Sequence, residues 1–273
     1  MDNKIPKIKI LVACHKADPN IRQDDIYMPI QVGAALHPKL DLGFQKDNEG
    51  ENISEKNASY CELTALYWAW KNLPKDVEYV GLAHYRRYFD INNKKIEKIL
   101  NNNRVIVAKP QIFPTNLFKD YAEQHNGLDL KETYQIIKES FPQYKTSFEK
   151  TILRNNRLSP FNMFIMRREL FDEFCTFIFG VLFELEKRIN LTNYNDYQKR
   201  IFGFISERLL NVFLNYIETN NKNVNKIYIN IIQLVDNKIS YLNTIINNFR
   251  YSISYSLSKS KSLNNSLKLF ENS

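Results

Sequence analysis

The stretch YVGLAHYRRYFD (79–90) decides the fold. Its first part, YVGLAHY (79–85), is a continuous apolar run of strand length, and such runs are typical of strands buried on both faces of a parallel sheet. In doubly wound sheets, ligands bind at the carboxyl ends of the strands. The stretch therefore predicts a buried strand that carries polar side chains to a ligand-binding edge. These side chains are His84, Tyr85, Arg86 and Arg87.

The surrounding sequence alternates between strand-like and helix-like patterns. IKILVAC (8–14) and RVIVAKP (104–110) are apolar runs of strand length, and MPIQVGAAL (28–36) predicts a further short element. In residues 59–72, apolar side chains recur at i, i+3, i+4 and i+7, which predicts a helix. The alternation predicts an α/β fold with a mostly parallel sheet flanked by helices. Later elements are predicted as helices over 114–157, 169–188 and 200–217 and as a strand over 161–167.

A change in composition follows Glu218, where Asn, Lys, Ser and Tyr become dominant. We therefore predict one domain over residues 1–218 and a basic, helical C-terminal appendage over residues 219–273. From Lys238 onward, five Lys or Arg residues face a single acid, Glu271. Such a segment suits an anionic membrane surface. A disordered tail or a contact between subunits is an equal alternative.

Composition excludes several classes of function. The 273 residues contain only 7 glycines and neither a GxGxxG nor a P-loop string, so a glycine-rich phosphate loop is not expected. Cys14, Cys61 and Cys175 share no metal-ligand spacing and, without a signal peptide, suit a reducing cytoplasm. No stretch has the ~18 apolar residues of a membrane span. The net charge of +8 fits either anionic partners or a general excess of lysine. No nucleic-acid-binding motif supports the first.

The paired arginines after the strand are the first candidate site. Guanidinium groups match phosphate oxygens in a bidentate geometry, so Arg86 and Arg87 suit a diphosphate, with His84 and Tyr85 beside it. A structural ion pair with a neighbouring carboxylate is the alternative. His15 and Lys16 end the strand over 8–14 and join the same edge, although His15 could equally cap a turn.

A second candidate is the polar loop that leads into the helix over 59–72. Its donors suit a ribose or a phosphate; they are Asn52, Ser54, Lys56 and Asn57. Glu62 is ambiguous, because Ser59 and Glu62 have the spacing of a capping box, which accounts for Glu62 without any chemistry.

The third candidate is Glu207 in FGFISERLLNVFL (202–214). With Ile205 and Leu209 directed inward, Glu207 falls on the opposite side of the helix, where it faces either a pocket or bulk water.

Long stretches of the chain resemble the family known as domain of unknown function 4422, whose members are regarded as glycosyltransferases of bacterial capsular and exopolysaccharide clusters. The resemblance implies transfer of a sugar from a nucleotide-sugar donor, such as UDP-galactofuranose or another UDP-sugar. The implied acceptor is a capsular, exopolysaccharide or lipopolysaccharide glycan, free or lipid-linked, reached from the cytoplasm or the inner membrane face. The matching stretches are ILVACHK (10–16), MPIQVGAAL (28–36), NISEKNASYCELTALYWAWKN (52–72), YVGLAHYRRYF (79–89), NMFIMRRELFDEFC (162–175) and FGFISERLLNVFL (202–214).

The order of elements also resembles the GT-A glycosyltransferase plan, in which a strand ends in an Asp-x-Asp motif that binds a divalent metal. Here that position is occupied by His84, Tyr85 and Arg86. A manganese or magnesium cofactor is therefore not firmly expected, and guanidinium charge could replace it at the leaving diphosphate. If a metal is used, Asp90 is the nearest carboxylate. In this plan the base is an acid at the start of a late helix, which corresponds to Glu207.

Two other classes of function remain as alternatives. One is a non-catalytic nucleotide- or sugar-binding module of the same fold, which donor hydrolysis or transfer would separate from an enzyme. The other is a basic nucleic-acid-binding protein, which would show salt-sensitive binding to DNA or RNA. We expect no nucleic-acid partner.

Overall fold

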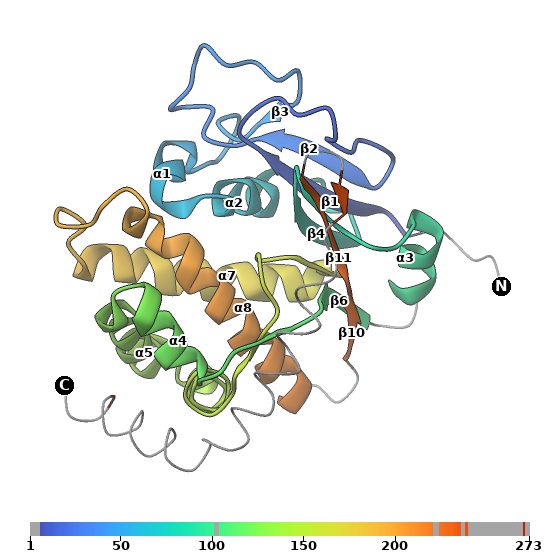
Figure 1. The fold of residues 1–273 in the computed structure, drawn as a ribbon. Helices are drawn as coiled ribbons and strands as arrows, with labels where there is room; N and C mark the ends of the chain where they lie inside the picture. Colours follow the sequence, from blue (N-terminus) through green and yellow to red (C-terminus); the bar gives the residue numbers. More distant parts are fainter. Residues whose placement is uncertain (1–5, 101–103, 221–223, 236–237, 240–269, 271–273) are drawn as a thin grey trace.

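A computed structural model describes residues 6–100, 104–220, 224–235, 238–239 and 270. Within these residues a ten-stranded sheet crosses the molecule, with helices on both faces (Figure 1). The predicted α/β fold is confirmed. The strands of this sheet are β1 (Ile8–Cys14), β2 (Tyr27–Gln31), β3 (Gln45–Lys46), β4 (Tyr79–His84), β5 (Arg87–Phe89), β6 (Arg104–Ala108), β9 (Phe164–Arg167), β10 (Asn225–Ile229), β11 (Ile231–Val235) and β12 (Lys238–Ile239).

The order along the main path of the sheet is β10-β6-β9-β4-β1-β2-β3. β1 pairs in parallel with both β2 and β4, whereas β9 runs antiparallel to β4 and β6. The close approach of β9 explains a glycine in β4, because a Cβ on Gly81 would lie 2.7 Å from the carbonyl oxygen of Phe164. A separate pair of short strands, β7 (Gln111–Ile112) and β8 (Arg157–Leu158), lies outside this sheet.

Helices cover the two faces unequally. Alternate residues of β1 point to opposite faces, so that Leu11 packs against the larger group of helices and Ile10 against the smaller α3 side. In Figure 1, α3 lies on one side of the sheet, and α2, α7 and α8 lie on the other. The helices are α1 (Asn57–Tyr60), α2 (Leu63–Asn72), α3 (Asn93–Leu100), α4 (Leu117–Gln124), α5 (Gly127–Ser140), α6 (Lys145–Phe148), α7 (Arg168–Arg188) and α8 (Ile201–Asn220). Short 3-10 or π turns cover Ser54–Lys56, Pro142–Tyr144, Glu149–Leu153 and Gln198–Arg200.

The helix predicted over 59–72 is broken in two. Cys61 has a φ of 51°, which ends α1 at Tyr60 and lets α2 begin at Leu63. The side-chain amide of Asn57 holds the break together, because it donates to the carbonyl oxygen of Cys61 and to the Thr64 hydroxyl. The predicted capping box is therefore wrong. The Ser59 hydroxyl donates to the Lys56 carbonyl oxygen, and the Glu62 side chain is directed elsewhere.

The sheet continues beyond the predicted domain boundary at residue 218. β10 pairs in parallel with β6, and β11 pairs with β5, so residues 225–235 are strands of the main sheet and not part of a helical appendage. Composition concealed these strands, because short runs such as NKIYI carry polar residues at the sheet edge. Phe270 packs edge-on against Phe118 with ring centroids 5.0 Å apart. Residues 240–269, with most of the predicted basic appendage, lie outside the described residues. In the part of the chain that is described, no helix is long and apolar enough to span a membrane.

Candidate functional site

A cavity of about 740 Å³ opens at the carboxyl ends of β1 and β4; we call it the edge cavity. Its walls come from the turn after β4, the start of α1, the segment before β9 and the first half of α8, so elements far apart in the sequence meet there. The lining residues are Ala13, His15, Val32, Asn57, Ala58, Cys61, Glu62, His84, Tyr85, Arg86, Arg87, Phe161, Tyr197, Arg200, Phe204, Glu207 and Gln233.

Arg86 lines the edge cavity and also forms an ion pair. Its Nε donates to Oδ2 of Asp18 at 3.0 Å, and the Asp18 side chain is only 8% exposed. The backbone N–H of Asn20, and then Arg86, hold the pKa of the Asp18 carboxyl below its usual value. The two predicted roles for Arg86, a structural ion pair and a place at a ligand edge, are therefore both compatible with its position.

Arg87 lies deeper than Arg86. Its guanidinium stacks on the Phe161 ring, with the central carbon 4.3 Å from the ring centroid. Among the described residues, its buried Nε has no hydrogen-bond partner. Burial lowers the pKa of Arg87, and the carboxylates of Glu207 and Glu62 oppose this shift. A buried donor without a partner is costly, so Arg87 is suited to bind an anion that enters the cavity.

Glu207 reaches the edge cavity from α8 and is held at both oxygens. Oε1 accepts a hydrogen bond from the backbone N–H of Phe161 at 2.9 Å, and Oε2 lies 3.3 Å from Nη1 of Arg208. Arg208 is buried and also bonds Asp120. Burial raises the pKa of Glu207, while Arg208 counteracts the shift. A carboxylate with fixed orientation and raised pKa has the properties of a general base.

Glu62 enters the same cavity because the helix breaks at Cys61. Its Oε1 accepts a hydrogen bond from the Asn162 amide at 2.7 Å. Among the described residues, the non-glycine positions with positive φ are Cys61, Phe161 and Asn162, and all three lie at or beside this cavity. Strained backbone of this kind concentrates at functional sites.

The two predicted histidines also lie at the edge cavity. His84 Nε2 is 2.7 Å from the carbonyl oxygen of Phe161, which ties the end of β4 to the segment before β9. His15 packs edge-on against Tyr85. Burial, followed by the charges of Lys16, Arg86 and Arg200, lowers the pKa of His15. His15 is therefore neutral at pH 7 and adds hydrogen-bonding capacity without charge.

Of the four donors predicted in the loop over residues 52–57, only Asn57 lines the edge cavity. The Ser54 hydroxyl is buried and donates to Asp47, and Lys56 forms a 2.8 Å ion pair with Glu186. The Asn52 amide bonds backbone carbonyl oxygens within its own loop. Asn57 does line the cavity, although its amide is engaged in the break between α1 and α2. Lys16 and Asp90 are exposed and do not line the edge cavity.

A family model described as "Domain of unknown function (DUF4422)" matches residues 9–221. The chain belongs to this family. The resemblance seen in the sequence is thereby confirmed. Among solved structures, the chain is similar to one titled "WbbM bifunctional glycosytransferase apo structure", with 26% sequence identity and a TM-score of 0.74. The match covers 86% of this chain and 46% of that one, so the chain corresponds to about half of the solved protein. No curated protein matches the chain.

The residues of this DUF4422 chain at the end of β4 do not suit the divalent metal of the GT-A plan. Hard cations prefer carboxylate and carbonyl oxygens, whereas this edge carries His84, Arg86 and Arg87. The carboxylates around the cavity already have partners. Asp18 pairs with Arg86, Glu62 accepts from the Asn162 amide, and Glu207 accepts from the Phe161 N–H and pairs with Arg208. Within the described ranges, no group of three or more His, Cys, Asp or Glu side chains could hold a metal ion.

The sequence reasoning missed several residues of the edge cavity, above all Arg200. Arg200 immediately precedes α8, and its Nε donates to Sγ of Cys61 at 3.3 Å. A cation at a helix N-terminus is electrostatically unfavourable, so its position was a usable signal for an anion nearby. Tyr197 and Phe161 lie in irregular segments, where periodicity gives no information. The other missed residues are Phe204 and Gln233.

Proposed function

We propose that this chain is a glycosyltransferase that uses a nucleotide-sugar donor. One observation carries the proposal: the edge cavity combines arginine side chains with a partly buried, oriented carboxylate at the carboxyl ends of parallel strands. Such an edge is the usual ligand site of open α/β sheets. The similarity to a protein titled a bifunctional glycosyltransferase supports the same class of reaction.

The donor diphosphate would bind to the arginines of the edge cavity. Arg87 has an unpartnered buried Nε, and Arg86 and Arg200 line the same space. Charge-assisted hydrogen bonds from arginine to phosphate are the strong ones in proteins. As the bond between the sugar and the diphosphate breaks, negative charge grows on the leaving group. Preorganised guanidinium groups would stabilise that charge.

Glu207 would act as the general base. In an inverting transfer, the acceptor hydroxyl attacks the anomeric carbon and its proton passes to the carboxylate. The carbon–oxygen bond to the diphosphate then breaks, and the nucleoside diphosphate leaves with the electron pair. Bonds from the Phe161 N–H and from Arg208 fix the carboxylate orientation. Its raised pKa makes it a stronger base than an exposed glutamate.

The finer assignment rests on the family resemblance. We propose a UDP-sugar as the donor, with UDP-galactofuranose as one case, and a capsular, exopolysaccharide or lipopolysaccharide glycan as the acceptor. The place of action would be the cytoplasm or the inner face of the cytoplasmic membrane, where lipid-linked acceptors occur.

A donor screen followed by a turnover assay tests the proposal. UDP-, GDP- and dTDP-sugars are added to the full chain, and a bound donor should raise the melting temperature by mass action. The stabilising sugar is then assayed for nucleoside diphosphate release with and without glycan acceptors. We expect release that requires Glu207. Stabilisation without any release would instead assign a non-catalytic binding module. No stabilisation and no turnover with any sugar would overturn the proposal.

A further inference from the structure

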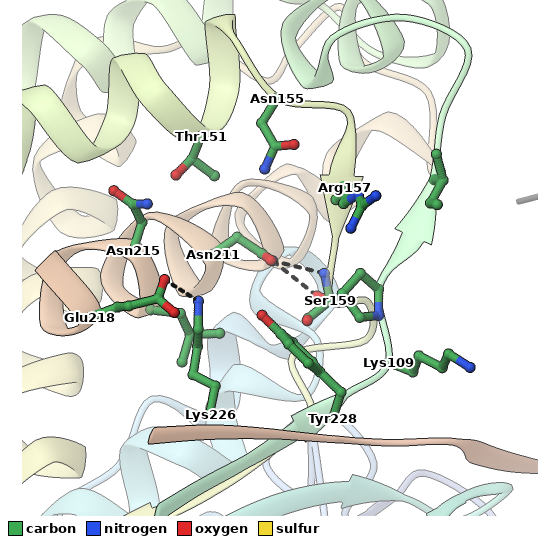
Figure 2. A pocket seen from close by; sticks show the side chains of 13 residues that line it. Lys109, Thr151, Asn155, Arg157, Ser159, Asn211, Asn215, Glu218, Lys226 and Tyr228 are labelled. Carbon is green, nitrogen blue, oxygen red and sulfur yellow. Dashed lines mark hydrogen bonds and ion pairs between the residues drawn. The ribbon is translucent and has the colours of Figure 1, made fainter. Parts of the chain in front are cut away.

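A second cavity of about 500 Å³ lies along the other half of α8, away from the edge cavity (Figure 2). We call it the α8 cavity. Its walls come from the C-terminal half of α8, the π turn before β8, the segment after β8 and the strand β10. The sequence pattern gives no indication of this cavity, because its residues are scattered over more than a hundred positions. Those used below are Thr151, Asn155, Ser159, Asn211, Asn215 and Tyr228.

Six of the thirteen residues that line the α8 cavity have neutral hydrogen-bonding side chains. Figure 2 shows side chains of Thr151, Asn155 and Asn215 around it, with Tyr228 extending from β10 toward Asn211. Asparagine amides both donate and accept, and hydroxyls do the same, so the lining can bond to groups of either kind. A sugar ring presents hydroxyls of this dual character around its rim.

Two features of the lining favour a polar ligand. The Oδ1 atom of Asn215 has no hydrogen-bond partner among the described residues, although a buried acceptor normally has one. Tyr228 is 45% exposed, which is unusual for so large a side chain. An aromatic ring with a polar tip can stack on the C–H face of a sugar and bond its hydroxyls.

The charges in the α8 cavity do not favour a nucleotide. Lys226 is paired with Glu218 at 2.7 Å, so the two charges neutralise each other and this cation is already engaged. Lys109 and Arg157 are exposed and contribute charge on the solvent side. A polyhydroxylated ligand fits this lining better than a diphosphate.

One side chain links the α8 cavity to the segment that orients Glu207. Asn211 lies one helical turn after Glu207, about 6 Å along the axis. Its amide accepts from the Ser159 N–H and donates to the Ser159 carbonyl oxygen. The same segment, two residues later, donates the Phe161 N–H to Glu207. The α8 cavity therefore adjoins the segment that orients the carboxylate of the edge cavity.

We propose that the α8 cavity binds a glycan, as a subsite for a sugar unit of the acceptor remote from the reacting hydroxyl. The assignment of this glycan as the acceptor rests on the proposed glycosyltransferase function. The binding of a glycan to the cavity does not depend on that function. Tyr228 stacks on the sugar ring, and Asn215 and Asn155 bond its hydroxyls. The subsite would set which glycan the enzyme extends.

Ligand-observed saturation-transfer NMR on the full chain tests the binding. The probes are methyl glycosides of glucose, galactose and mannose and their di- and trisaccharides. Asn215→Leu and Tyr228→Ala are compared with Asn220→Leu, which places the same substitution on the exposed end of α8, outside the cavity. We expect at least one probe to bind the native chain and the control, and to lose roughly tenfold or more in affinity with both cavity variants. Stabilisation by the nucleotide sugar should be unchanged.

The outcomes separate this inference from the proposed function. Glu207→Gln should abolish transfer and leave saturation transfer from the glycan intact. If the native chain binds glycan and the cavity variants do not, but no turnover is found, the proposed enzyme activity is overturned and the glycan site stands. Probes that bind no chain, or that bind both cavity variants as well as the native chain, would overturn the glycan site. In an active enzyme, Tyr228→Ala should raise the acceptor KM about tenfold with kcat retained.

Discussion

Residues 52–57 and residues 84–87 are both polar segments rich in hydrogen-bond donors, yet the fold uses them in opposite ways. In the first, the Ser54 hydroxyl bonds Asp47 and the Lys56 ammonium pairs with Glu186, so the donors are consumed inside the protein. In the second, Arg86 and Arg87 line the edge cavity, and the Nε of Arg87 has no partner among the described residues. Polar composition alone does not distinguish a ligand loop from a structural one.

The difference follows from one buried carboxylate. Asp47 is fully buried and accepts hydrogen bonds from the backbone N–H groups of Gly33 and Ala34 and from the hydroxyls of Ser54 and Thr64. A buried charge needs this many partners, and one of them, Ser54, comes from the loop over residues 52–57. At residues 84–87 the corresponding acid, Asp18, engages Arg86 and leaves Arg87 facing the cavity.

The largest effect on turnover should come from substitution of Glu207, the carboxylate in the edge cavity. We expect Glu207→Gln to retain its fold and donor binding, because glutamine can still accept from the Phe161 N–H, and to reduce transfer by ~100-fold or more. Glu186→Gln is the matched control, since it removes the partner of Lys56 on the loop side. Its turnover should equal that of the native chain. Normal turnover by Glu207→Gln would shift the role of base to Glu62.

The next largest effect should be on nucleotide affinity, and it should distinguish Arg86 from Lys56. Arg86→Ala should weaken nucleotide binding by roughly 10- to 150-fold, the value of one charge-assisted bond to phosphate. Lys56→Ala should leave the affinity unchanged, because Lys56 pairs with Glu186 at a distance from the cavity. Isothermal titration with the nucleoside diphosphate measures both. Arg86→Ala also removes the ion-pair partner of Asp18. A lower melting temperature with unchanged nucleotide affinity would therefore show that Arg86 has only a structural role.

Substitutions in residues 52–57 should change the stability of the fold and not the affinity for the donor. Ser54→Ala removes a hydroxyl donor from the buried Asp47 carboxylate. The unfolding free energy should fall by about 1.5–3 kcal/mol, the contribution of one hydrogen bond to a charged group. Donor affinity of the folded variant should be that of the native chain. Urea unfolding and donor titration on one preparation measure the two quantities. A loss of donor affinity without a loss of stability would instead mean that Ser54 binds the donor.

The sheet could be predicted from sequence because its central strands are continuous apolar runs. Ile8–Cys14 and Tyr79–His84 are buried over nearly their whole length, so hydrophobicity alone identifies them. β10 and the break at Cys61 could not be found in this way. β10 lies at the sheet edge with polar residues interspersed, and the break depends on the amide of Asn57, a contact between side chain and backbone that leaves no periodic trace.

The site could be predicted in part for the same reason. His84, Arg86 and Arg87 follow a recognisable strand, and Glu207 falls outside an apolar stripe, so their placement depends on regular elements. Residues such as Arg200 and Phe161 come from irregular segments that only the tertiary fold brings to the cavity. Glu62 was hidden by a local pattern, the capping box, that the helix break at Cys61 removes.

A smaller effect concerns pH. Burial raises the pKa of Glu207 above its ordinary 4.5, so the folded chain binds this proton more tightly than the unfolded chain. The stability that the group contributes is complete below 4.5 and is lost as the pH rises through the folded pKa. Glutamine cannot ionise. As the pH rises from 4.5 through the folded pKa, the melting temperature of Glu207→Gln should therefore increase relative to that of the native chain. The activity of the native chain should fall toward acid pH, where Glu207 becomes protonated. A difference in melting temperature that is constant with pH would contradict the raised pKa.

The smallest expected effect is that of a chelator. At the end of β4, a cation would meet His84, Arg86 and Arg87, and Asp18 is already paired with Arg86. If guanidinium groups neutralise the leaving diphosphate, as proposed, activity should change little in excess EDTA. Asp90→Asn is the matched variant and should also be neutral, because Asp90 lies outside the edge cavity. Abolition by chelator with rescue by manganese would contradict this account. If Asp90→Asn then abolished that rescue, Asp90 would be a metal ligand, and residues 84–87 would bind the diphosphate together with a cation.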